Sequence, residues 1–101
     1  MSVSAQPVGN GSTMKIQITD RFDFNIHKDL RNVYKDNASS TNYIVDLKNA
    51  SYMDSSALGM LLQLREHAGG GKDAVTISNA DSNIQEILRI ANFDKLMTVE
   101  A

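Results

Sequence analysis

Asp54, Ser55 and Ser56 stand together where an apolar, strand-like run gives way to apolar residues at helical spacing. Two hydroxyls and a carboxylate at such a junction have an ordinary structural explanation. Asp and Ser are preferred N-caps, because their side-chain oxygens accept hydrogen bonds from N–H groups that the first helical turn leaves free. Residue types alone therefore favour an N-cap at this position.

The same position also suits a phosphorylation site. A hydroxyl at a helix start is exposed, and the free N–H groups and the positive end of the helix dipole tolerate a phosphate there. A phosphate on Ser55 would add about −1.5 to −2 charges beside Asp54. A partner that docks on this surface would then meet repulsion and a charge that is costly to desolvate. The residues thus permit a binding switch in which the fold does not change.

The sequence predicts no catalytic or metal site, and we expect neither enzyme activity nor a cofactor. His27 and His67 fall in different predicted helices without partners at metal-ligand spacing, so we expect both to be solvated surface residues. No GxSxG elbow surrounds Ser55 or Ser56. A hydrolase or transferase with Ser55 as nucleophile would also need a base within hydrogen-bond reach. Glycines 69–71 follow a helical pattern, whereas a phosphate-binding loop precedes one, so they predict a helix stop.

The composition indicates one small globular domain. The chain has 101 residues, of which 42% are hydrophobic, a formal net charge of −2 and no cysteine. Its 10 lysines and arginines are scattered, so we expect no nucleic-acid partner and no membrane association. The longest clearly apolar stretch, residues 57–62, is too short to span a bilayer, and residues 1–13 lack the features of a signal peptide. We therefore expect a cytoplasmic protein.

The periodicity of apolar residues predicts the elements that position these side chains. Strands are expected at residues 3–8, 14–18, 43–47, 74–78 and 96–99, and helices at residues 26–34, 54–68 and 82–91. Strands that alternate with helices favour an α/β sheet with helices packed on it. Residues 1–13 are expected to form either an edge strand with a turn at residues 9–11 or a flexible tail.

Local signals refine two of the helix starts. Asn25 is expected to cap the first helix, and Ser82 with Gln85 three residues later forms a capping-box pattern for the last one. Phe22 and Phe24 are spaced to point to the same side of an extended chain.

The run YIVDLKNASYMDSSALGMLLQLRE, residues 43–66, resembles the signature of the STAS family of sulphate transporters and anti-anti-sigma factors. In that family an apolar strand ends in an Asp, here Asp46, and Asp-Ser-Ser-Gly-Leu-Gly opens the next helix. The resemblance extends over roughly residues 14–99. It implies a single STAS domain over residues 14–101, with a mixed β-sheet of about four or five strands and about three helices packed on it.

For bacterial members, the resemblance implies an anti-sigma factor antagonist that switches partners. The unphosphorylated domain binds an anti-sigma factor or a related regulator that is also a serine kinase. Phosphorylation of Ser55 breaks that complex, a PP2C-type serine phosphatase restores it, and Ser56 is the alternative acceptor. We expect the protein to be a monomer. The implied partner-binding residues are Met53, Asp54, Ser55, Ser56, Ala57, Leu58 and Gly59.

Two questions stay open at this point. The domain could instead be a constitutive subunit of a larger complex, such as a lipid-transport system, with Ser55 only a helix cap. The family often has Gly where this chain has Ala57, and that methyl group could stiffen the helix start or narrow what docks there. Gly59 is retained, and it permits either close approach of a partner or tight packing of the helix on the sheet.

Overall fold

The computed structural model describes residues 2–9, 12–38 and 41–100. The turn expected at residues 9–11 falls largely outside these ranges. Residues 3–8 form a strand at the edge of the main sheet, which fits one of the two alternatives for the N-terminal segment.

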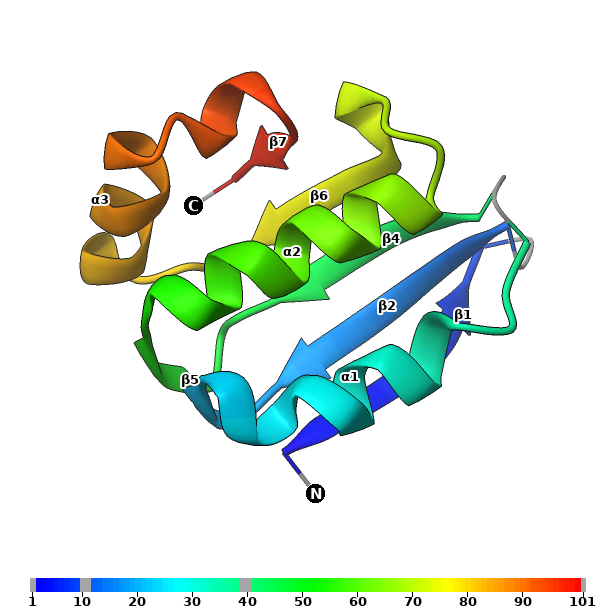
Figure 1. Cartoon of the computed structure of the whole chain (residues 1–101), viewed down its shortest axis with the longest axis horizontal. Coiled ribbons are helices and arrows are strands. Elements are labelled where there is room, and N and C mark those ends of the chain that lie inside the picture. The colour runs from blue at the N-terminus through cyan, green and yellow to red at the C-terminus, as the bar shows by residue number, and fades with distance from the viewer. Residues whose placement is uncertain (1, 10–11, 39–40, 101) are drawn as a thin grey trace.

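The main sheet has five strands and is mixed (Figure 1). It contains β1 (Val3–Val8), β2 (Thr13–Ile18), β4 (Asn42–Asp46), β6 (Val75–Ser78) and β7 (Thr98–Val99), in that spatial order. β1 runs antiparallel to β2, and the remaining neighbours are parallel. The helices that connect the parallel strands make this arrangement possible, because a parallel neighbour needs a crossover. The expected α/β fold with a mixed sheet is confirmed.

A second, two-stranded sheet was not expected from the sequence. β3 (Asp20–Phe22) pairs in parallel with β5 (Ala50–Met53), and Phe22 lies opposite Met53. Strands of three and four residues are too short to show a period of two, so their sequence gives no clear signal. β5 leads directly into the helix that begins at Ser55, and its pairing with β3 therefore fixes the backbone in front of that helix.

Three α-helices pack around the sheet. They are α1 (His27–Tyr34), α2 (Ser55–His67) and α3 (Ser82–Ile90), with short 3-10 helices η1 (Phe24–Ile26), η2 (Lys72–Ala74) and η3 (Phe93–Lys95). Figure 1 shows α1 and α2 side by side across one face of the sheet, with α3 beyond β6. β7 is shorter than expected, because the Met97 N–H still bonds to the Phe93 carbonyl and delays the strand.

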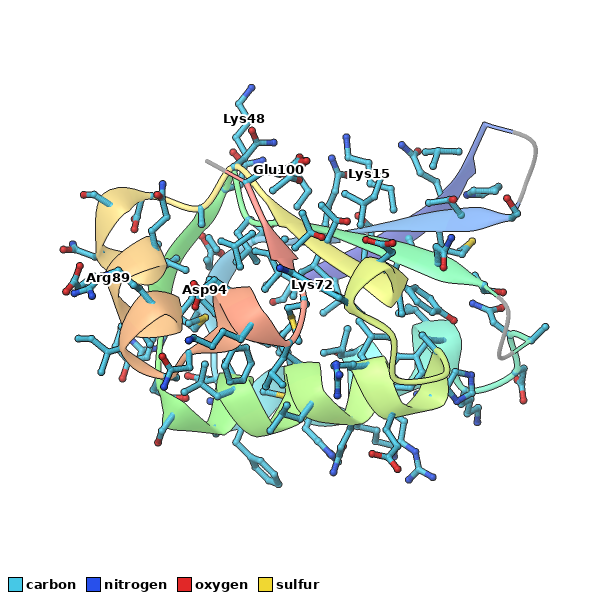
Figure 2. All side chains as sticks on the ribbon, turned by 90° about the horizontal axis from the view of Figure 1, so that it is seen from above. Lys15, Lys48, Lys72, Arg89, Asp94 and Glu100 are labelled. Atoms are coloured by element: carbon cyan, nitrogen blue, oxygen red, sulfur yellow. The ribbon has the colours of Figure 1, made fainter. Side chains whose placement is uncertain are left out.

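The core lies between the sheet and the helices. Ile16, Val45 and Ile77 are aligned across three neighbouring strands and are fully buried, together with Leu61 and Leu64 of α2. Their burial removes several large apolar side chains from water, which is the main favourable contribution to folding. The other face of the sheet is more polar and open. Figure 2 shows Lys15 and Lys48 projecting from the side opposite α2.

The observed N-caps of η1 and α3 lie one or two residues before the expected ones. Asp23 and not Asn25 caps η1, and its carboxylate accepts a hydrogen bond from the Asn25 N–H. Asp81 and not Ser82 caps α3, because its carboxylate reaches the Ile84 N–H at 2.8 Å. In both cases an aspartate stands one or two residues earlier and accepts the bond that was assigned to its neighbour.

The chain turns at η1, which separates two aromatic residues expected on one side. Phe22 is fully buried, whereas Phe24 is 67% exposed. The prediction that they share a side is wrong, because the extended backbone ends before Phe24.

The glycine run ends α2 as expected. Gly69 and Gly70 both have positive φ, and the Gly70 N–H bonds to the Arg65 carbonyl at 2.8 Å. Within residues 2–9, 12–38 and 41–100, no helix has the length and apolar character needed to cross a membrane.

Candidate functional site

Ser55 is the first residue of α2, directly after the strand that pairs with β3. Met53 on one side and Ala57 on the other are buried, so their packing holds the short segment between them against the core. Asp54 is the N-cap of α2. Ser55 itself is exposed. The helix start is therefore rigidly placed while its first side chain faces solvent.

The two serine hydroxyls have different surroundings. The Ser56 hydroxyl donates to Oδ1 of Asp54 at 2.5 Å, and the Ser56 N–H donates to the same oxygen at 3.0 Å. Over the part of the chain that the structure describes, the Ser55 hydroxyl has no hydrogen-bond partner. The Ser56 hydroxyl is therefore hydrogen-bonded to the N-cap residue, whereas the Ser55 hydroxyl is free.

Asp54 carries a negative charge next to the free hydroxyl. The bond from the Ser56 hydroxyl lowers the pKa of Asp54, and burial opposes this effect. The backbone N–H groups of Ser56 and Ala57 and the positive charge of Arg21 lower this pKa further. Asp54 is therefore ionised at neutral pH, and any anion added to Ser55 enters a site that already holds a carboxylate.

Arg21 of β3 also lies at this site, which sequence reasoning missed. Its guanidinium carbon lies 3.9 Å from the centre of the Tyr52 ring, and its Nε donates to Oδ2 of Asp23 at 3.1 Å. The pairing of β3 with β5 brings Arg21 opposite Tyr52. No motif signals this contact, because the two residues are far apart in sequence and β3 has no recognisable pattern.

The implied partner surface needs correction at two positions. Ser55 and Gly59 are exposed. Asp54, Ser56 and Leu58 are partly buried, whereas Met53 and Ala57 are buried. Partner contact through the Met53 and Ala57 side chains is therefore wrong. Ala57 belongs to the inner stripe of α2, so its methyl group fills the core and does not narrow a docking surface.

Gly59 faces open space. A Cβ added there would meet no heavy atom within 4 Å, so the glycine does not serve tight packing of α2 on the sheet. Leu62, one turn further along the same helix face, is 40% exposed. Tyr52, in the strand before the helix, is 39% exposed. Exposed apolar and aromatic groups therefore lie on the strand before the free hydroxyl and further along α2.

The two histidines are partly exposed, and each ring also contacts an aromatic side chain, which the expectation of solvated surface residues did not include. The His27 ring stacks on Phe24 at a centroid distance of 5.1 Å, and the His67 ring meets Tyr34 edge-on at the same distance. His67 Nε2 also lies 3.0 Å from the carbonyl oxygen of Asn37. Both rings line a pocket between α1 and α2, together with Arg31, Tyr34, Gln63 and Glu66. Neither ring is hydrogen-bonded to Ser55.

Asp46 ends β4, as the sequence indicated, and holds the loop that leads to β5. Its Oδ1 accepts hydrogen bonds of 3.0 Å from the Lys48 N–H and from the Asn79 side chain, and Lys15 Nζ lies 3.5 Å from Oδ2. Burial raises the pKa of Asp46, but the bonds from Asn79, Lys48 and Gln17 and the charge of Lys15 lower it overall. This buried carboxylate therefore joins the loops after β4 and β6.

Comparison with known proteins identifies the family. The family model described as "Mlab, STAS domain" matches residues 6–99. A STAS-domain containing protein of Pseudomonas aeruginosa strain UCBPP-PA14 is 45% identical over 100 residues, and the alignment covers 98% of this chain and 99% of that protein.

Solved structures share the fold at low identity. The Bacillus cell fate determinant SpoIIAA in its phosphorylated form aligns with a TM-score of 0.74 at 16% identity, covering 98% of this chain and 91% of the other. The anti-sigma factor antagonist SpoIIAA in its unphosphorylated form gives 0.66 at 17% identity, covering 87% and 82%. An anti-sigma factor antagonist from Mycobacterium paratuberculosis gives 0.73 at 13% identity, covering 98% and 86%. The expected resemblance is confirmed by the family model and the Pseudomonas relative, and the chain belongs to the STAS domain family.

Proposed function

We propose that this chain is a phosphorylation-controlled protein-binding switch of the anti-sigma factor antagonist type. It binds an anti-sigma factor or a related serine kinase while Ser55 is unmodified and releases that partner when Ser55 is phosphorylated. The observation that carries this proposal is the free, exposed hydroxyl of Ser55 at the start of α2, beside a Ser56 hydroxyl that is bonded to Asp54. The protein acts as an acceptor in this scheme and is not itself an enzyme.

The chemistry requires only an accessible hydroxyl on this chain. The partner kinase transfers the γ-phosphoryl group of ATP to Ser55 Oγ, the hydroxyl proton is lost, and ADP leaves. A PP2C-type phosphatase reverses the modification with water, which restores the hydroxyl and releases inorganic phosphate. ATP is bound by the kinase, and no cofactor is assigned to this chain. Both exchanges belong in the cytoplasm, where ATP is available.

The position of Ser55 supports a change in binding without unfolding. The free N–H groups and the dipole of α2 favour an anion at the helix start, so the modified helix remains stable. A partner that covers Ser55 must instead desolvate a phosphate next to the ionised Asp54. The modification therefore weakens the complex more than the fold.

Gly59 adds support for a partner at this surface. A glycine in the interior of a helix is destabilising by roughly 0.5–1 kcal/mol relative to alanine. Nothing within the described part of this domain occupies the space beside Gly59. Close approach of another chain would account for the absence of a side chain there.

Proteins of the same fold give further support. SpoIIAA is an anti-sigma factor antagonist, and its structure is known in unphosphorylated and phosphorylated forms. A fold of this kind can therefore carry a phosphate.

The alternative, a constitutive subunit with Ser55 as a helix cap, loses part of its basis. Asp54 provides the cap, and Ser55 is the first residue of the helix. The structural role that this alternative assigned to Ser55 is filled by another residue.

The proposal is tested by mapping phosphate on protein purified from its native host, using intact-mass and tandem mass spectrometry. The unmodified protein, Ser55→Ala, Ser55→Asp and the matched control Ser56→Ala are then compared in pull-downs. We expect phosphate on Ser55 and loss of one partner, identified as an anti-sigma factor or kinase, only with Ser55→Asp. Absence of phosphate under all growth conditions, with the same partner retained by all four forms, would overturn the proposal.

A further inference from the structure

We propose that Arg21 is the internal receptor for a phosphate on Ser55, and that its guanidinium exchanges Asp23 for the phosphate when Ser55 is modified. This inference rests on the proposed function, because it takes Ser55 as the phosphorylated residue. It adds a residue outside the family motif and assigns it a role in the modified state.

The position of Arg21 is fixed by the small sheet. The pairing of β3 with β5 sets Arg21 opposite Tyr52, and Tyr52 is three residues before Ser55. The guanidinium carbon lies 3.9 Å from the centre of the Tyr52 ring, a cation–π contact that orients the group. The charge of Arg21 also contributes to the lowered pKa of Asp54, the neighbour of Ser55. A cation is thus held over the ring of Tyr52, three residues before the modification site.

The guanidinium has unused capacity for hydrogen bonds. Arginine carries five N–H donors in a planar fork, and only Nε of Arg21 bonds to Asp23. Its two terminal amino groups make no hydrogen bond in the described part of the chain, and the side chain is 61% exposed. A phosphate can therefore approach from solvent and bind the fork in a bidentate manner, which a single bond to a carboxylate does not match.

The charges around Arg21 favour this exchange. Asp23 and Asp54 contribute two negative charges against the single positive charge of Arg21. A phosphate on Ser55 adds about −1.5 to −2 more charges. Because it carries more negative charge than Asp23, the phosphate competes with Asp23 for the guanidinium of Arg21. Asp23 keeps a separate role after the exchange, since its other oxygen accepts from the Asn25 N–H at 3.0 Å. The η1 turn can therefore persist while Arg21 moves.

The exchange gives phosphorylation an effect beyond added charge. Arg21 now covers part of the exposed Tyr52 ring, which borders the partner surface. When the guanidinium turns towards the phosphate, this aromatic surface changes together with the charge at Ser55. The modified protein then presents a different recognition surface to its partners.

The test uses full-length protein with phosphoserine installed at position 55 by genetic encoding, so it needs no kinase. Phosphorus NMR measures the pKa of the phosphate in the parent, in Arg21→Gln and in the matched control Arg89→Gln. Arg89 is also an exposed arginine paired with one carboxylate, that of Glu86 on α3. A nearby cation lowers the pKa of an anionic group, so we expect Arg21→Gln to raise the phosphate pKa by roughly one unit and Arg89→Gln to leave it unchanged.

The Nε–H resonance of Arg21 provides a second readout and should shift on phosphorylation. Equal phosphate pKa values in the parent and Arg21→Gln, or equal shifts in both arginine variants, would overturn the inference. Thermal unfolding of the unphosphorylated variants confirms that both are folded. Partner pull-downs decide the proposed function separately, so the failure of one proposal is distinguishable from the failure of the other.

Discussion

Replacing Gly59 by alanine should stabilise this protein and weaken its partner complex. Gly59 lies inside α2, is exposed, and has no heavy atom within 4 Å of the position that a Cβ would take. Alanine in an exposed helix interior is favoured over glycine by about 1 kcal/mol. For a domain of this size, 1 kcal/mol corresponds to a rise in Tm of roughly 4–8 °C.

Thermal and urea unfolding measure this gain directly. Gly70→Ala is a suitable control, because Gly70 has a φ of +80° that an alanine adopts only with strain. We expect Gly59→Ala to raise Tm and Gly70→Ala to lower it. An unchanged or lower Tm in Gly59→Ala would refute the claim that neither packing nor backbone conformation within the domain requires a glycine at this position.

The same substitution tests why the glycine is present. If a partner approaches the helix closely at Gly59, an added methyl group overpacks the interface at a cost of about 1–3 kcal/mol. Since about 1.4 kcal/mol is a tenfold change in affinity, the dissociation constant should rise by roughly tenfold or more. Isothermal titration calorimetry with the captured partner provides the measurement. Unchanged affinity would place Gly59 outside the contact.

Further predictions concern the two aspartates. Asp54→Ala should lower Tm because the cap of α2 is lost, whereas Ser55→Ala should stay within about 0.5 kcal/mol of the parent in urea unfolding. Asp46→Asn should destabilise the fold by about 1–3 kcal/mol, since it removes the charge of a buried, hydrogen-bonded carboxylate and its ion pair with the partly exposed Lys15. The lowered pKa of Asp46 means that its contribution is present above the ordinary aspartate pKa and is lost as pH falls through its folded value. Unfolding between pH 7 and pH 3 should show this loss in the parent and a shallower one in Asp46→Asn.

Much of the fold is predictable from periodicity, because long apolar patterns reflect burial directly. The alternating run in β2 and the stripe of Leu61 and Leu64 in α2 each indicate one buried side, and the structure buries those sides. The pair of strands β3 and β5 is not predictable in this way. Their short sequences carry no period, and their pairing depends on tertiary packing.

The candidate site was predictable only in part. The motif located Ser55 and Asp54, but residue types could not say which of the aspartate and the serines supplies the cap. That depends on the backbone position at which the helix begins, and Asp54 occupies it. Met53 and Ala57 fall within the motif yet face inward, because adjacent residues of a strand or helix point in different directions. Arg21 reaches the site through strand pairing, which a local motif does not encode.

The central claim is that phosphorylation of Ser55 controls partner binding. It is tested most directly by titrating the captured and purified partner into the unmodified protein and into protein with encoded phosphoserine at position 55, at the same salt concentration. Burying a phosphate in the interface beside the ionised Asp54 costs several kcal/mol of desolvation and repulsion, so we expect the phosphorylated form to bind at least about 100-fold more weakly. Equal affinity of the two forms would contradict the account.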